Sequence, residues 1–290
     1  MKKPLFTGAC TALVTPFLDG EVNYPMMEQL LRRQIDAGIR AVVVCGTTGE
    51  APTLSDDEKL ELFHRAKSYV GSDCMIIAGT GSNCTSHAAE LSLAAEQLGV
   101  AALLIVSPYY NKAAPEGLVA HYLTIAHTVS LPIIAYNVPT RTGVDIPVSV
   151  CKRLSSIPNM AGIKEAAMDV RKVTKICREC GPDFAVWSGN DDLTVPSIAL
   201  GAQGVISVLS NILPTEMQAM AQAALAGDLD TAAALQQELQ PLAELLFCEP
   251  NPIPVKASMK YIGYDCGIPR LPLTELSKEN KEKLKNALGR

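Results

Sequence analysis

Residues 101–143 read AALLIVSPYYNKAAPEGLVAHYLTIAHTVSLPIIAYNVPTRTG and carry the pattern that decides the fold. Two short apolar runs, 102–106 and 133–136, stand on either side of a helical pattern over residues 116–129. A run that is apolar throughout suits a strand covered on both faces, and a helix between two such runs suits a parallel crossover. The stretch therefore predicts a strand–helix–strand unit.

The same alternation continues along most of the chain. Further apolar runs occur at residues 9–14, 41–45, 75–78, 160–164, 185–187 and 204–208, and clear helical patterns at residues 26–37, 56–70 and 85–98. Eight such units predict an α/β fold, a (β/α)8 TIM barrel. A doubly wound sheet is the competitor, but no GxGxxG follows the first run, and the nearest candidate, GTGSNC at residues 79–84, follows the third.

After about residue 212 the strand signals stop. Residues 216–226, 229–247, 255–262 and 278–288 all have helical patterns, separated by segments rich in glycine and proline. We expect a C-terminal helical extension with a small core of its own. The predicted division is a barrel domain over residues 1–225 and a helical domain over residues 226–290.

Composition excludes several other classes of protein. The chain has 290 residues, is 48% hydrophobic and carries a net charge of −5. These values exclude intrinsic disorder and argue against nucleic acid or an anionic membrane as the main partner. No apolar run reaches the ~20 residues that a membrane span requires.

Cysteine usage indicates the cellular compartment. Nine cysteines, an odd number, are scattered along the chain, which favours reduced thiols and a cytoplasmic location over a disulfide scaffold. Residues 1–17 combine two lysines with small side chains, so a weak signal peptide and a strand entering the protein are both open interpretations. Pro4 and Thr7 interrupt the apolar region and favour the strand.

Lys164 is the strongest single candidate for catalysis. In a parallel barrel the carboxyl ends of all strands meet at one rim, where catalytic groups lie. Lys164 ends the run 160–164, so its amine is expected at an apolar barrel mouth, where desolvation disfavours the ammonium form. A neutral amine can form a Schiff base with a carbonyl substrate. The open alternative is a structural ion pair with Glu165 or another rim carboxylate.

Neighbouring strand ends supply other polar groups. Tyr136 ends the preceding run, and its phenol could transfer protons near the amine. Thr47 and Thr48 lie in a GTTG turn whose hydroxyls and amides could hold a carboxylate, although a tight structural turn explains the same letters. Arg141 offers a bidentate fork for a second carboxylate, or is a solvated loop residue.

Metal and nucleotide sites are not indicated. The four histidines show no HExxH spacing, and Cys177 and Cys180 form a single CxxC on a helical stretch with no second CxxC. No P-loop is present. We expect no metal.

Four motifs together resemble the dihydrodipicolinate synthase family of pyruvate-dependent class I aldolases. They are GTTGE at 46–50, YYN at 109–111, YNVPTRTG at 136–143 and GIKEA at 162–166, and their order and spacing also match. The resemblance runs from about residue 8 to the C-terminus. It implies a lyase of the diaminopimelate route to lysine that uses no cofactor or metal beyond a covalent lysine–pyruvate imine.

The resemblance implies four catalytic residues. Lys164 would form the Schiff base with pyruvate. Tyr136, Thr47 and Tyr110 would relay protons, with Tyr110 reaching in from a neighbouring subunit. The pyruvate enamine would attack the aldehyde of L-aspartate 4-semialdehyde, and the product's amino group would displace the lysine as the ring closes.

It also implies four substrate-binding residues. Thr48 and the adjacent turn amides would hold the carboxylate of pyruvate, and Arg141 would hold that of L-aspartate 4-semialdehyde. Gly189 and Ile206 would line the pocket.

Arg141 distinguishes this family from similar aldolases. N-acetylneuraminate lyase typically has GSTGE and lacks an arginine in the loop after its YN-x-P, and the 2-keto-3-deoxy sugar acid aldolases vary there. Both activities are kept as alternatives. A non-catalytic barrel with a binding role is a further alternative, and it would be expected to lack one of the imine or relay groups, all of which are present.

Regulation and assembly are implied only through the resemblance. In family members inhibited by lysine, the effector site matches Ala51, Leu54, Asn83 and Tyr109. Here Asp56 and Lys59 stand where inhibited relatives often carry His, and His87 where they often carry Glu. A cation at Lys59 predicts weak or absent inhibition by lysine. A relay shared through Tyr110 requires at least a dimer, and the family is commonly a homotetramer, a dimer of dimers.

Overall fold

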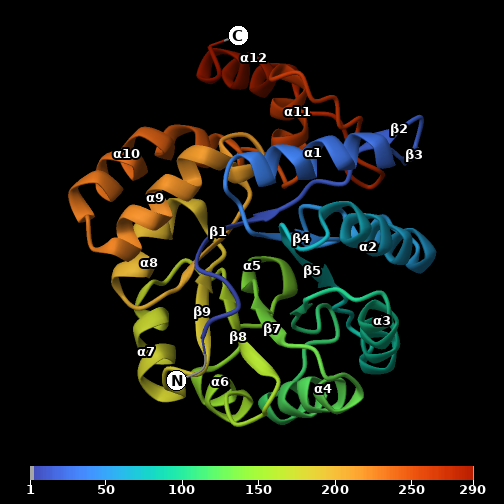
Figure 1. The fold of residues 1–290 in the computed structure, drawn as a ribbon, viewed down its shortest axis with the longest axis vertical. Coiled ribbons are helices and arrows are strands. Elements are labelled where there is room, and N and C mark those ends of the chain that lie inside the picture. Colours follow the sequence, from blue (N-terminus) through green and yellow to red (C-terminus); the bar gives the residue numbers. More distant parts are fainter. Residues whose placement is uncertain (1–2, 290) are drawn as a thin grey trace.

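Eight parallel strands close into a barrel in the computed structural model of the chain, which describes residues 3–289 (Figure 1). Around the barrel the strands follow the order β1-β10-β9-β8-β7-β6-β5-β4, and β4 pairs back onto β1. Their bounds are β1 Gly8–Ala12, β4 Ala41–Val44, β5 Met75–Gly79, β6 Ala102–Val106, β7 Ile133–Asn137, β8 Met160–Glu165, β9 Ala185–Ser188 and β10 Gly204–Ser207. The predicted (β/α)8 barrel is confirmed.

Helices surround the barrel on its outer face (Figure 1). The helices of the described residues are α1 Tyr24–Asp36, α2 Asp56–Val70, α3 Thr85–Gln97, α4 Pro115–Thr128, α5 Pro139–Thr142, α6 Val148–Leu154, α7 Arg171–Cys180, α8 Thr194–Ala199, α9 Pro214–Ala226, α10 Leu229–Leu245, α11 Ile253–Tyr261 and α12 Lys278–Ala287, of which α11 and α12 lie beyond α1 and outside the surrounding layer. Short 3₁₀ turns occur at Ala51–Thr53, Asp191–Leu193 and Leu209–Asn211. The helix α2 begins where expected, because Ser55 and Glu58 form a reciprocal capping box.

Glycine allows the barrel to close. At the junction of the first and last strands, Gly8 of β1 is in register with Gly204 of β10. A Cβ on Gly204 would overlap the carbonyl group of Gly8, so no larger residue fits without moving the strands apart. The first and last barrel strands can therefore pair directly.

An aromatic stack fills part of the barrel interior. Trp187 on β9 is fully buried, and its ring stacks on Phe6 with a centroid separation of 4.9 Å. The indole Nε1 donates a hydrogen bond to the Phe6 carbonyl at 3.2 Å, which satisfies its only polar group. The interior is therefore a packed core, and the space for a ligand is confined to the rim.

The C-terminal helices do not form a separate core, so that expectation is wrong. α9 packs on β1, and α10 packs on both α9 and α8. Leu239, Met259 and Leu284 belong to the same buried cluster as Leu30 and Leu62 of the barrel helices. The reason is that α10 lies against α8 and α9, so its apolar residues join the core beneath those helices.

Some elements were not foreseen. A two-stranded hairpin, β2 Phe17–Leu18 and β3 Glu21–Val22, follows β1 and lies beside the C-terminal helices (Figure 1). The first strand covers Gly8–Ala12, where residues 9–14 were expected. None of the helices within residues 3–289 combines the length and apolar character needed to cross a membrane.

Candidate functional site

Lys164 and Tyr136 lie side by side at the rim of the barrel. They are register partners on β8 and β7, which brings residues 28 positions apart into contact. Lys164 is 5% exposed, and its Nζ lies 4.3 Å from the centroid of the Tyr136 ring. No hydrogen bond or ion pair holds this Nζ in the part of the chain that the structure describes. The amine is therefore sequestered from bulk water without being tied to a carboxylate.

Glu165 does not pair with Lys164, so the structural ion pair considered from the sequence is wrong. Successive side chains of a strand point to opposite faces, and Glu165 points away from the barrel interior towards α7. There it pairs with Lys172 at 3.1 Å and accepts a hydrogen bond from Asn137 at 2.8 Å. Burial raises the pKa of the Glu165 carboxyl, and the nearby Lys172 ammonium opposes that shift. Glu165 thus braces the ends of β7 and β8 from outside.

Gly189 lies beside the lysine, and Ile206 lies in the barrel interior. A Cβ on Gly189 would lie 3.0 Å from Lys164 Cε, so the absence of a side chain leaves room for the lysine to move. Ile206 is fully buried and shares the barrel-interior cluster with Tyr136 and Trp187. The structure therefore brings Gly189 to the lysine and places Ile206 in the interior cluster that includes Tyr136.

The GTTGE turn is strained at both ends. Cys45 and Glu50 have φ values of 55° and 57°, which are costly for residues other than glycine. Within the turn, the amides of Gly49 and Ala51 both donate to the Gly46 carbonyl. The backbone amides of Thr47 and Thr48 have no acceptor among residues 3–289. The GTTGE segment therefore forms a tight turn and also presents two unpaired N–H donors.

A cavity of about 690 Å³ opens beside this turn. Thr47, Tyr136 and Arg141 line one part of it. The four predicted effector residues also line it: Ala51, Leu54, Asn83 and Tyr109. In a single chain, the candidate catalytic and effector regions are therefore continuous.

Tyr110 is not brought to the site within one chain. It lies on the loop between β6 and α4, has a φ of 70° and is 91% exposed. Among the described residues, no hydrogen bond or ring contact joins Tyr110 to Lys164, Tyr136 or Thr47. An exposed tyrosine on a strained loop is free to contact another molecule.

The charge of Lys59 is compensated. Asp56 accepts from Lys59 Nζ at 3.0 Å through one oxygen and contacts His87 Nε2 at 2.7 Å through the other. Asp56 is the single carboxylate in the lining of this cavity among the described residues. A cationic ligand would therefore meet no unpaired carboxylate.

Metal-binding clusters were also sought. No group of three His, Cys, Asp or Glu side chains within residues 3–289 is arranged to hold a metal ion. Cys177 and Cys180 lie half-buried on α7, and burial raises the pKa of both thiols, that of Cys180 to about 11. Neither thiol is activated as a nucleophile.

The sequence reasoning missed a contribution from the C-terminal segment. Asn251, in the loop between α10 and α11, donates from Nδ2 to Thr48 Oγ1 at 2.9 Å. Its carbonyl accepts from Arg141 Nη2 at 3.2 Å. The available signal was the polar residue in Glu249-Pro250-Asn251-Pro252, a segment considered only as a separator of helices.

A buried ion pair between Glu50 and Lys256 ties the strained GTTGE turn to the C-terminal helix α11. Lys256 Nζ on α11 lies 2.8 Å from Glu50 Oε1, and both side chains are 1% exposed. The other carboxylate oxygen accepts from the backbone amide of Arg270 at 2.8 Å. Burial lowers the pKa of Lys256, and the charge of Glu50 opposes that shift. Glu50 is thus fixed by two C-terminal partners.

Comparison with known proteins assigns the chain to a family. A family model described as the dihydrodipicolinate synthetase family matches residues 5–290. The chain belongs to this family. A curated 4-hydroxy-tetrahydrodipicolinate synthase from Acetivibrio thermocellus is 44% identical over 288 residues, covering 99% of this chain and 98% of the relative.

Solved structures of family members are also similar over nearly the whole chain. The chloride-inhibited dihydrodipicolinate synthase from Acinetobacter baumannii complexed with pyruvate has a TM-score of 0.96, 44% identity and 98% coverage of both chains. A structure described as the first monomeric dihydrodipicolinate synthase variant has a TM-score of 0.96 and 40% identity, covering 98% of this chain and 96% of that one.

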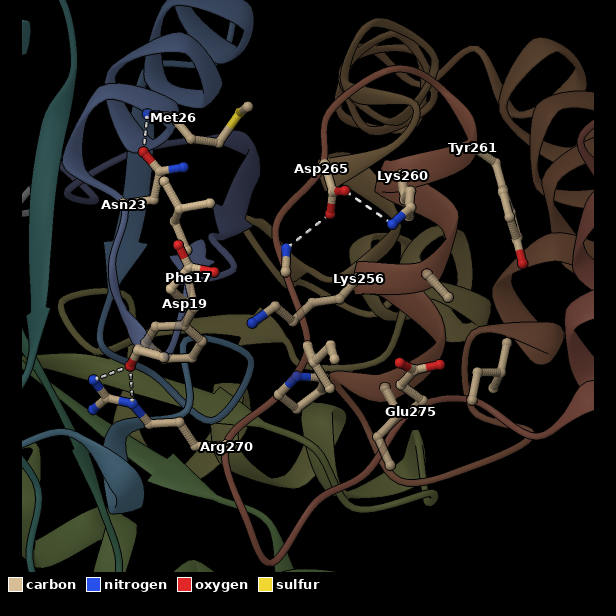
Figure 2. A pocket seen from close by; sticks show the side chains of 18 of the residues that line it. Phe17, Asp19, Asn23, Met26, Lys256, Lys260, Tyr261, Asp265, Arg270 and Glu275 are labelled. Carbon is tan, nitrogen blue, oxygen red and sulfur yellow. Dashed lines mark hydrogen bonds and ion pairs between the residues drawn. The ribbon is translucent and has the colours of Figure 1, made fainter.

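In this family member, a second cavity of about 860 Å³ lies between the β2–β3 hairpin and the C-terminal helices (Figure 2). Lys256 Nζ lies 4.2 Å and Arg270 Cζ 4.5 Å from the centroid of the Phe17 ring. All three side chains are labelled in Figure 2. Arg270 also pairs with Glu58. None of the predicted site residues lines this cavity. Lys256, the partner of Glu50, is part of its lining.

Replacing Lys256 tests the importance of the buried pair. Lys256→Met should lower the free energy of unfolding by about 3–5 kcal/mol, because Glu50 is left buried without its counter-ion. The matched control is Lys260→Met, whose pair with Asp265 is more than half exposed and is worth about 0–1 kcal/mol. Urea unfolding followed by the fluorescence of Trp187, the sole tryptophan, measures both. Equally small losses of unfolding free energy in Lys256→Met and Lys260→Met would contradict a stabilising role for the buried Glu50–Lys256 pair.

Proposed function

We propose that this chain is a 4-hydroxy-tetrahydrodipicolinate synthase that condenses pyruvate with L-aspartate 4-semialdehyde. Lys164 carries the proposal, since it is a buried amine with no carboxylate partner among the described residues, beside a tyrosine and at a barrel rim. The names of the curated relatives and the similarity over the full chain support the same activity.

The proposed reaction starts with attack of Lys164 Nζ on the carbonyl carbon of pyruvate. Loss of water gives the imine, and loss of a methyl proton gives the enamine. The enamine carbon then forms a bond to the aldehyde carbon of the semialdehyde. The amino group of that substrate attacks the imine carbon, closes the ring and releases Lys164, so that one water is formed for each pair of substrates.

The roles proposed for the other residues fit their positions. Tyr136 and Thr47 line the cavity and would transfer protons at the imine carbon. Tyr110 of a second copy of the chain would be the third member of this proton relay. Thr48 would hold the pyruvate carboxylate. Arg141, exposed on the cavity wall, would hold the carboxylate of the semialdehyde.

The proposal includes no metal or organic cofactor, because the imine itself withdraws electrons from the reacting carbon. Activity retained after prolonged treatment with a chelator is the expected result. A cytoplasmic location is part of the proposal and rests on cysteine usage.

Borohydride trapping tests the central step. Wild-type protein incubated with pyruvate and reduced should gain one covalent adduct, and Lys164→Ala should gain none. Arg141→Ala should keep the adduct but lose roughly 10- to 100-fold in kcat/KM for the semialdehyde, because one charged hydrogen-bonding partner is removed. The control is Arg178→Ala, whose side chain pairs with Glu179 on α7.

Three results would overturn parts of this proposal. Wild-type protein without an adduct would exclude the imine mechanism. Unchanged semialdehyde kinetics in Arg141→Ala would exclude the role of Arg141. Cleavage of N-acetylneuraminate or a 2-keto-3-deoxy sugar acid, without condensation, would assign the chain to another aldolase activity.

We also propose that the active site is shared between subunits of a homotetramer built as a dimer of dimers. Tyr110→Phe should lower kcat roughly 100-fold, the contribution of a proton-transferring group. Co-expression of Tyr110→Phe with Lys164→Ala should restore part of the activity, because each mixed pair of subunits then contains one complete site out of two. Light scattering gives the assembly size, and a fully active monomer would contradict the shared relay.

Weak or absent inhibition by lysine is proposed as well. The reason is the lack of an unpaired carboxylate beside Ala51, Leu54, Asn83 and Tyr109, since Asp56 is engaged by both Lys59 and His87. A coupled assay should show little loss of rate at millimolar lysine. Submillimolar inhibition would contradict this expectation.

A further inference from the structure

Asn251 bridges the two regions assigned to the two substrates. It belongs to the segment between α10 and α11, more than 100 residues from Arg141 and about 200 from Thr48, and is 5% exposed. The side chain contacts Thr48, whereas the main-chain carbonyl contacts Arg141. One residue therefore affects each region through a different chemical group.

The direction of the hydrogen bond to Thr48 has a chemical consequence. In the structure the Asn251 amide nitrogen donates, so Thr48 Oγ1 is the acceptor of this bond, and the buried Asn251 Oδ1 has no partner among the described residues. The hydroxyl keeps one proton, and Oγ1 has no other hydrogen-bond partner in the described part of the chain. Thr48 is 2% exposed, and its hydroxyl proton has no acceptor among the described residues, so a carboxylate bound beside the turn is the acceptor that it lacks.

We propose that Asn251 is a positioning residue for the first substrate, orienting the Thr48 hydroxyl as a donor to the carboxylate of pyruvate. The inference rests on the proposed function. The side chain acts on the pyruvate region, while Arg141 is held by the backbone carbonyl, which every substitution retains. Side-chain variants of Asn251 should therefore affect pyruvate far more than the semialdehyde.

Other contacts hold this loop in place when the Asn251 side chain is removed. Glu249 accepts hydrogen bonds from the Ser277 amide and the Asn280 side chain, at 3.1 and 2.7 Å. On the other side, Lys256 is fixed to Glu50. Asn251→Ala is therefore expected to fold with the loop in position.

Two variants separate orientation from packing. Asn251→Ala should raise the KM for pyruvate roughly tenfold and leave kcat and the KM for the semialdehyde near wild-type values. Asn251→Asp preserves size but replaces the donor by an acceptor, which takes the Thr48 proton and adds a like charge. It should raise the pyruvate KM more than Asn251→Ala does, whereas a residue needed only for packing would show the reverse order.

A double-mutant cycle with Thr48→Val tests whether Asn251 acts through the hydroxyl. In the Thr48→Val background, Asn251→Ala should cause no further rise in the pyruvate KM, because the group that it orients is already absent. Glu249→Ala is the control for loop mobility: its pyruvate KM should rise less than that of Asn251→Ala, because the Asn251 side chain can still bond to Thr48, and an equal rise would overturn the role of that side chain.

The half-saturation by pyruvate is measured in the borohydride-trapping assay as well as in turnover. A wild-type adduct with an unchanged pyruvate half-saturation in Asn251→Ala would overturn the role of Asn251 alone. Additive effects of Asn251→Ala and Thr48→Val would also overturn it. Absence of the adduct in wild-type protein would overturn the proposed function, and this inference with it.

Discussion

The pairing of β1 with β10 closes the barrel, and the geometry of the site depends on that closure. Once the sheet is closed, the carboxyl ends of all eight strands form one rim, and residues separated by long stretches of chain become neighbours. Lys164 and Tyr136 meet as register partners, Gly189 lies beside the lysine directly after β9, and Ile206 of β10 joins the interior cluster that includes Tyr136. The two glycines at the seam, Gly8 and Gly204, make this closure sterically possible.

A second layer of support comes from the end of the chain. The turn that carries Thr47 and Thr48 is strained at Glu50, and the side chain of Glu50 is tied to Lys256 and to the backbone of Arg270. Strained backbone persists only where surrounding contacts over-determine it. The C-terminal segment therefore supports the turn at the barrel rim. Its apolar residues also belong to the hydrophobic cluster of the barrel.

Much of this could be read from the sequence, because the evidence was local. Continuous apolar runs separated by helical patterns predicted the barrel, and the position of Lys164 after such a run predicted a buried amine at the rim. The idea of a separate C-terminal core failed, since helical periodicity shows that a face is apolar without showing what it packs against. The pairing of Lys164 with Glu165 failed because side chains alternate along a strand.

By itself, the sequence determined the order of strands and helices, the chemistry at each strand end and the family of the chain. The tertiary structure decided which groups meet. The bonds from Asn251 to Thr48 and Arg141 and the pair of Lys256 with Glu50 span more than 100 residues, and no local pattern encodes such distances. The physical reason is that these contacts form only when the closed barrel and the packed C-terminal helices bring their partners within hydrogen-bonding reach.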